Sequence, residues 1–228
     1  MLGHLTRRPR QRGLSLVELM VGLALGLFIA GIATTLLLGR LREQRALLVE
    51  IRLMQDLRTS ADIVARDLRR AGFWADASAA VWQPSTALAA NPYTALTPDT
   101  GTADSVSFRF SRDEVENNMV DNDEQFGFRV RNGVLQMLIG AGGWQALTDD
   151  TTMVVTAFRV TPEVQDIALD ALCEQPCPLS APACGPHQFV RRLTVSITGH
   201  ASTDVSVVRS TRSTVRLRND AVIGRCPA

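Results

Sequence analysis

The dominant feature of the hydrophobic pattern is an apolar run from Leu19 to Gly39 that contains no charged residue. As a helix, these 21 residues span ~31 Å, about the hydrocarbon thickness of a bilayer. Arginines flank the run on both sides, at Arg7, Arg8, Arg10 and Arg12 before it and at Arg40, Arg42 and Arg45 after it. The pattern predicts a membrane-spanning helix whose basic leader stays on the cytoplasmic side.

Beyond Arg40 the pattern changes to apolar residues mostly three or four positions apart, with charged residues between them. These apolar positions are Leu41, Leu48, Ile51, Met54, Leu57, Ala61, Val64, Leu68 and Ala71. The spacing predicts an amphipathic helix that ends before Gly72, a good C-cap residue. Joined to the apolar run, it makes one helix from Leu14 to Ala71, about 58 residues and ~87 Å long.

The rest of the chain alternates between apolar and polar residues with the period of β-strands. Strands are expected within 105–110, 126–131, 134–139, 152–160, 189–198 and 204–217, and Asn132-Gly133 predicts a hairpin turn. Short connections favour antiparallel pairing. The fold class is therefore α+β, a long N-terminal helix packed on an antiparallel sheet. The expected division is 1–13 leader, 14–40 transmembrane helix, 41–72 amphipathic helix, 73–104 connector and 105–228 β-sheet domain.

Composition and motifs limit the classes of function that the chain can have. The formal net charge is +1, and without the four leader arginines 20 basic residues face 23 acidic ones, which argues against nucleic-acid binding. No nucleophile elbow, zinc-protease motif or phosphate-binding glycine loop occurs in the sequence. We therefore expect no enzyme, no cofactor and no metal.

Glu18 does not fit a plain membrane anchor or signal peptide. A carboxylate at mid-bilayer costs roughly 2.5–3.5 kcal/mol, and less near the interface. If the chain is cut between Gly13 and Leu14, however, the new ammonium of Leu14 lies one helical turn from Glu18. The two charges can then pair within one chain or between staggered chains, where a low dielectric strengthens the interaction. Glu18 is thus predicted to be an assembly residue.

The stretch GLSLVELMVGLALG resembles the class III leader and helix start of type IV prepilins and type II secretion pseudopilins. The resemblance implies cleavage by prepilin peptidase after Gly13, N-methylation of Leu14 and assembly through Glu18. Leu14 departs from the commoner Phe, and Thr35 stands where many major pilins have a helix-bending proline. The stretch RDLRRAGF, Arg66 to Phe73, resembles PilW-like minor pilins.

This resemblance implies a minor pilin that primes or caps a type IV pilus, anchored in the inner membrane with a periplasmic body. Its partners would be other minor pilins, the major pilin, prepilin peptidase and the inner-membrane assembly platform. A minor pseudopilin of type II secretion and a membrane-anchored periplasmic enzyme or binding protein remain alternatives.

Four cysteines, Cys173, Cys177, Cys184 and Cys226, are predicted to form two disulfides in an oxidising compartment. Three pairings are open, and a four-thiolate zinc site is the rival, although the spacing is not a standard one. Residues 115–127 gather four acidic side chains. We expect a solvated loop there; Ca²⁺ binding is the alternative, without EF-hand spacing.

Overall fold

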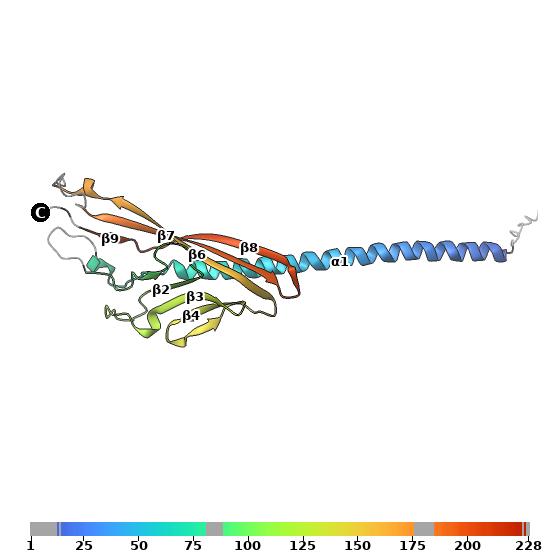
Figure 1. The fold of residues 1–228 in the computed structure, drawn as a ribbon, viewed down its shortest axis with the longest axis horizontal. Helices are drawn as coiled ribbons and strands as arrows, with labels where there is room; N and C mark the ends of the chain where they lie inside the picture. The colour runs from blue at the N-terminus through green and yellow to red at the C-terminus, as the bar shows by residue number, and fades with distance from the viewer. Residues whose placement is uncertain (1–12, 14, 81–88, 176–184, 225, 227–228) are drawn as a thin grey trace, which may run out of the picture. The chain divides into compact units, whose positions relative to one another are not determined.

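The computed structural model describes residues 13, 15–80, 89–175, 185–224 and 226 (Figure 1). The chain forms two compact units, Met1–Leu48 and Val49–Ala228. A single helix, α1 (Leu16–Leu68), contributes residues to both. The architecture is α+β, as the hydrophobic pattern predicts, and pilin-like, as the resemblance of the leader implies.

Helix α1 ends three residues before the expected position. Arg70 and Ala71 donate to carbonyls only three residues back, Asp67 O and Leu68 O, so the last residues form a tighter turn. Gly72 follows with φ +74°, the left-handed conformation that glycine adopts at helix ends. The Gly72 N–H donates to Arg109 O at 2.8 Å, so the predicted glycine takes the left-handed conformation but does not cap a helix carbonyl.

The part of α1 within the first unit is apolar and exposed. An 18-residue window of the helix has a mean hydropathy of 2.3, and none of it is buried. By length and composition this helix is able to cross a membrane.

In the second unit α1 buries one face. Its buried residues are Leu53, Leu57, Ser60, Ala61, Val64, Ala65 and Leu68. The predicted apolar stripe is buried from Leu57 onward, whereas Leu48 and Ile51 before it are 64% and 60% exposed. The buried positions begin only at Leu53, so the stripe continues beyond the part of the helix that packs against the sheets.

The strands form two antiparallel sheets, where the pattern predicts one. The first sheet has the order β1-β2-β3-β4-β5, and the second has β6-β7-β8 with β9 paired to β7. The strand bounds are β1 Leu96–Thr97, β2 Ser105–Arg109, β3 Gln125–Arg131, β4 Val134–Ile139, β5 Trp144–Ala146, β6 Met153–Ala168, β7 His187–Ala201, β8 Asp204–Arg216 and β9 Ala221–Ile223. The short 3₁₀ turn η1 (Ala77–Ala80) lies between α1 and β1. Three further 3₁₀ turns lie between strands: η2 Asn122–Glu124, η3 Gly140–Gly142 and η4 Asp170–Leu172.

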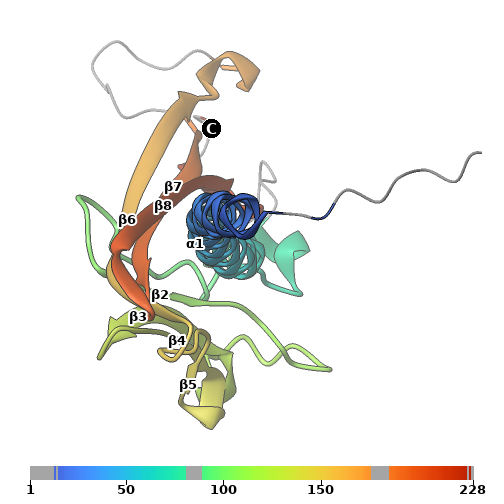
Figure 2. The same cartoon turned by 90° about the vertical axis from the view of Figure 1, so that its right-hand side faces the viewer.

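Both sheets pack on α1 through one continuous core. The core joins helix residues such as Leu57 and Val64 to Phe108 and Phe128 of the first sheet and Ile197 of the second. Figure 2 shows strands of both sheets beside the part of α1 that belongs to the second unit. At about 25 cal/mol per Å² of buried apolar surface, this shared core is the main stabilising term for the second unit.

The hairpin between β3 and β4 follows the Asn-Gly signal. Asn132 and Gly133 have φ values of 53° and 76°, the two left-handed residues of a type I′ turn. The flanking residues Arg131 and Val134 are paired. A side chain at residue 133 would meet Val154 Cγ1 at 2.8 Å, so packing also favours glycine there.

The described part of the connector 73–104 contains buried side chains and a short strand. Trp74 and Tyr93 within it are 3% and 0% exposed, and Leu96–Thr97 pairs with β2. The connector therefore contributes side chains to the interior of the second unit.

Candidate processing and assembly site

The proposed cleavage region lies directly before α1. Gly13 and Ser15 are exposed, and a Cβ built on Gly13 would meet no atom within 4 Å. Leu14, the expected N-terminal residue after cleavage, lies outside the described residues. The Ser15 carbonyl accepts a hydrogen bond from Leu19 N at 3.2 Å and so begins the helical ladder.

Glu18 is the third residue of α1 and is exposed. A carboxylate in the first turn interacts favourably with the positive end of the helix dipole. Ser15 precedes it by three residues, which is the Ser-x-x-Glu spacing of a capping box. Glu18 therefore also suits a capping role at the helix start. The argument from the cost of a carboxylate in the bilayer does not consider this role.

The hydroxyls within the apolar part of α1 are satisfied inside the helix. Thr34 Oγ1 donates to Ala30 O and Thr35 Oγ1 donates to Ile32 O, both at 2.8 Å. The helix is continuous through Thr35, the position at which many pilins have a proline. The apolar segment thus exposes no unpaired threonine hydroxyl.

The acidic segment 115–127 is not simply solvated, which corrects the sequence-based expectation. Glu124 is 0% exposed. Its Oε1 accepts a hydrogen bond from Arg112 N at 2.8 Å, and its Oε2 accepts one from Asp121 N at 2.9 Å. These bonds to backbone amides offset the cost of burying the carboxylate.

Tyr93 is the residue that holds this segment to the connector. Its hydroxyl lies 2.9 Å from Glu116 Oε1, 3.0 Å from Met119 O and 3.2 Å from Glu124 Oε1. Burial, followed by the hydrogen bond to Glu116, raises the pKa of the Tyr93 phenol above its ordinary value, so the phenol stays a donor. Trp74 Nε1 adds a hydrogen bond to Asn118 Oδ1 at 2.7 Å.

Replacing Tyr93 by phenylalanine is expected to lower the free energy of unfolding by about 1–3 kcal/mol, because the cluster of Glu116, Met119 O and Glu124 loses its phenol donor. Chemical unfolding of the full chain in detergent measures the difference. Glu114→Gln, at an exposed position directly before the segment, is the control and should stay within about 0.5 kcal/mol of the wild type. Equal stability of Tyr93→Phe and this control would contradict the assigned role.

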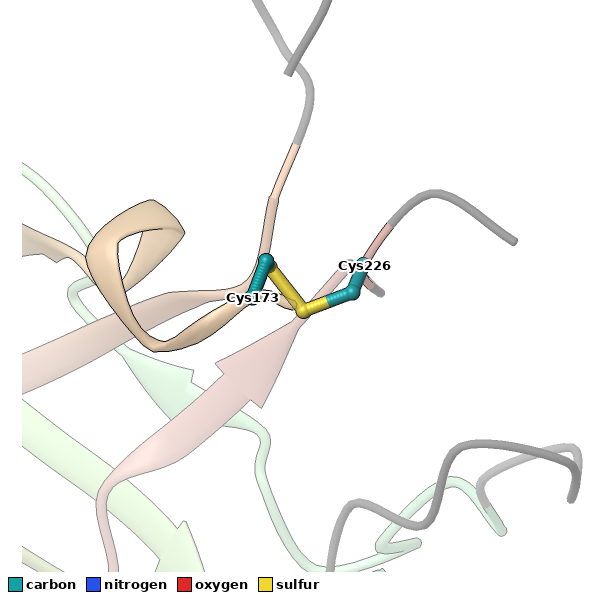
Figure 3. Close-up of a disulfide and its surroundings, with 2 residues drawn as sticks. All are labelled: Cys173 and Cys226. Atoms are coloured by element: carbon teal, nitrogen blue, oxygen red, sulfur yellow. A yellow bond between two sulfur atoms is a disulfide. The ribbon is translucent and has the colours of Figure 1, made fainter. Parts of the chain in front are cut away.

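A disulfide joins Cys173 to Cys226 (Figure 3). Cys173 follows η4 and Cys226 follows β9, and their Cα atoms are 5.4 Å apart. A zinc site made of all four thiolates requires every cysteine to be reduced, so this bond is incompatible with it. Cys177 and Cys184 lie outside the described residues.

Removing this disulfide should destabilise the second unit. The bond links residues 53 positions apart, so its loss should lower the free energy of unfolding by about 2–4 kcal/mol. The main reason is that the unfolded chain gains conformational entropy. Chemical unfolding of Cys173→Ser/Cys226→Ser measures the loss, with the Cys177→Ser/Cys184→Ser pair for comparison. A loss below about 0.5 kcal/mol in the first variant would show that the bond contributes little.

In the described part of the chain, no group of three or more His, Cys, Asp or Glu side chains is arranged to hold a metal ion. The segment 115–127 therefore provides no such ligand group there. Two of its acidic side chains, Glu116 and Glu124, accept hydrogen bonds from the connector and from neighbouring amides.

Residues 8–34 match the prokaryotic N-terminal methylation motif. Together with a long apolar helix and antiparallel sheets, this match defines a pilin-like protein with a class III leader. Residues 46–217, more than half of the chain, match the family described as prepilin peptidase-dependent protein B, and the chain belongs to that family. No curated protein and no solved structure gives a significant match.

Proposed function

We propose that this chain is a minor pilin of a type IV pilus, a structural subunit rather than an enzyme. The observation that carries the proposal is the methylation motif over residues 8–34, which covers the start of α1, a helix with an 18-residue apolar window that is wholly exposed. In the monomer that surface has no protein partner within the described residues. A membrane before assembly and neighbouring pilin helices after it would cover the surface.

In this proposal prepilin peptidase cuts between Gly13 and Leu14. The exposure of Gly13 supports the cut, because a peptidase must reach the backbone on both sides of the bond. Methylation of the Leu14 nitrogen leaves an amine that remains charged. Glu18 then provides the opposite charge one turn along the helix.

The pairing matters because it occurs away from water. Between staggered helices, an ammonium and a carboxylate attract each other far more strongly than at a wet surface. A wrong register leaves both charges buried and unpaired, which costs several kcal/mol. The pair from Leu14 and Glu18 would therefore set the register of this chain in the filament.

The body fits a role at the start or tip of the filament. It carries two sheets and a disulfide near the chain end, and its second unit extends from Val49 to Ala228. We propose a periplasmic body with a single membrane pass, and other minor pilins, the major pilin and the inner-membrane platform as partners. Because Cys173 and Cys226 are bonded to each other, we propose that Cys177 and Cys184 form the second disulfide. The PilW-like stretch RDLRRAGF supports a minor pilin.

Deletion of the gene tests the proposal. We expect filaments seen by electron microscopy to fall to a small fraction of the wild-type number and to return on complementation. Unchanged filaments with a lost type II secretion product would instead assign the chain to a secretion pseudopilus. No change in either filaments or secretion would contradict an assembly role.

A further inference from the structure

A pocket of about 240 Å³ lies where the end of α1 meets the end of β8. It is lined by Arg69, Arg70, Phe73, Ser111, Arg218 and Asn219. Three of these residues belong to the stretch RDLRRAGF, whose purpose the assembly proposal leaves unexplained. We propose that this pocket binds an oxyanion, a carboxylate or a phosphate group, through Arg69, Arg70 and Arg218.

The three arginines are not used within the described part of the chain. Neither an ion pair nor a side-chain hydrogen bond links Arg69, Arg70 or Arg218 to another described residue. Other arginines of the same unit do have carboxylate partners; Arg209 lies 2.6 Å from Glu50 and Arg216 lies 2.8 Å from Asp220. Three like charges around one pocket repel each other, and a bound anion removes that repulsion.

Stacking holds one of the arginines in place without occupying its donors. The guanidinium carbon of Arg70 lies 4.1 Å from the centroid of the Phe110 ring. Phe110 in turn stacks on Phe126, with centroids 3.9 Å apart. A stacked guanidinium uses its face, so the N–H groups at its edge stay free to bind a ligand.

A purely structural explanation would be that the arginines cap the C-terminus of α1. Helix capping does not account for all three arginines. Cations are favoured at a helix C-terminus. The nearby carbonyls already have donors, however: Asn219 Nδ2 donates to Ala71 O and Asn91 Nδ2 donates to Gly72 O. Arg218 comes from the segment after β8 and is not part of the helix at all.

The size of the pocket limits the ligand. Sites for whole small molecules span about 300–1,000 Å³, so 240 Å³ suits one charged group with a short stem. Phe73, 46% exposed, offers an apolar wall for that stem. A guanidinium group donates two parallel hydrogen bonds to the oxygens of a carboxylate or a phosphate. The bound oxyanion could therefore be free phosphate or the carboxylate of an acidic polypeptide.

Isothermal titration calorimetry on the full-length chain in a neutral detergent tests the site. Inorganic phosphate and glutarate are the probes, each titrated at constant ionic strength in chloride. We expect the wild type to bind at least one probe. The Arg69→Gln/Arg218→Gln variant should weaken binding by at least about tenfold, because two charge-assisted donors are lost. Arg212→Gln, an exposed arginine of β8, is the matched control and should bind as the wild type does.

The pattern of binding identifies the source. Binding of phosphate alone indicates a free or esterified phosphate, and binding of glutarate indicates a carboxylate on a polypeptide. Absence of binding by the wild type to both probes would overturn the proposal, as would equal binding by the double variant. These outcomes do not depend on pilus assembly, so the site and the proposed function can fail separately.

Discussion

Glu18→Gln is expected to leave the chain inserted and processed but to reduce its incorporation into filaments by more than about a hundredfold. Removing one member of a charge pair buried away from water costs about 3–5 kcal/mol. Each 1.4 kcal/mol changes an equilibrium about tenfold, so a cost of about 3–5 kcal/mol lowers incorporation by more than about a hundredfold. Immunoblotting of sheared filaments and of the membrane fraction measures the two pools.

Glutamine is the informative replacement because Glu18 also has the position of a capping-box residue relative to Ser15. Glutamine serves that cap as glutamate does, but carries no charge. Normal assembly of Glu18→Gln together with failure of Glu18→Ala would assign the residue to helix capping. Glu43→Gln is the control; its partner Arg40 is exposed, so this ion pair contributes little and assembly should be normal.

Gly13→Val is expected to block processing and to leave the full leader on the chain. A peptidase that binds the backbone closely at this residue has no room for a branched side chain, and valine is also restricted in its backbone conformation. The basic leader then stays attached, and no ammonium forms at Leu14. Filament incorporation should fall as far as in the Glu18 variant, but for a different reason.

Intact mass of the membrane-extracted chain distinguishes the two defects. Gly13→Val should retain the mass of residues 1–13, whereas Glu18→Gln should have lost it. Gly3→Val lies in the same leader away from the cut and should be processed normally. Complete processing of Gly13→Val would show that residue 13 does not define the cleavage site.

The local parts of the fold follow from short stretches of sequence. Asn132-Gly133 predicts its hairpin because few residue pairs adopt two left-handed conformations in succession. The helix face from Leu57 to Leu68 follows from spacing alone. The left-handed conformation of Gly72 after the helix is equally local.

The parts that the sequence does not predict depend on distant contacts. Strand β6 continues eight residues past the expected end at Val160, through Pro162. Proline is tolerated there because β6 is an edge strand in its sheet. Its final residues are mostly exposed, so no alternation of apolar and polar residues marks them. The division into two sheets likewise depends on tertiary contacts.

The candidate sites also differ in whether a local stretch of sequence predicts them. Gly13, Leu14 and Glu18 are neighbours in sequence, so a local pattern suffices to propose them. Burial of Glu124 depends on Tyr93, 31 positions away, and an acidic segment gives no sign of it. The arginine pocket joins residues 69–73 to Arg218, and only the folded chain brings them together.

Peptide mass spectrometry of the mature N-terminus tests the central claim most directly. The chain is purified from its native membrane, digested, and its N-terminal peptide sequenced. The proposal predicts that the first residue is Leu14 and that its nitrogen carries one methyl group. A chain that begins at Met1, at a residue beyond Ala30, or at an unmodified Leu14 would contradict the claim that processing prepares this helix for filament assembly.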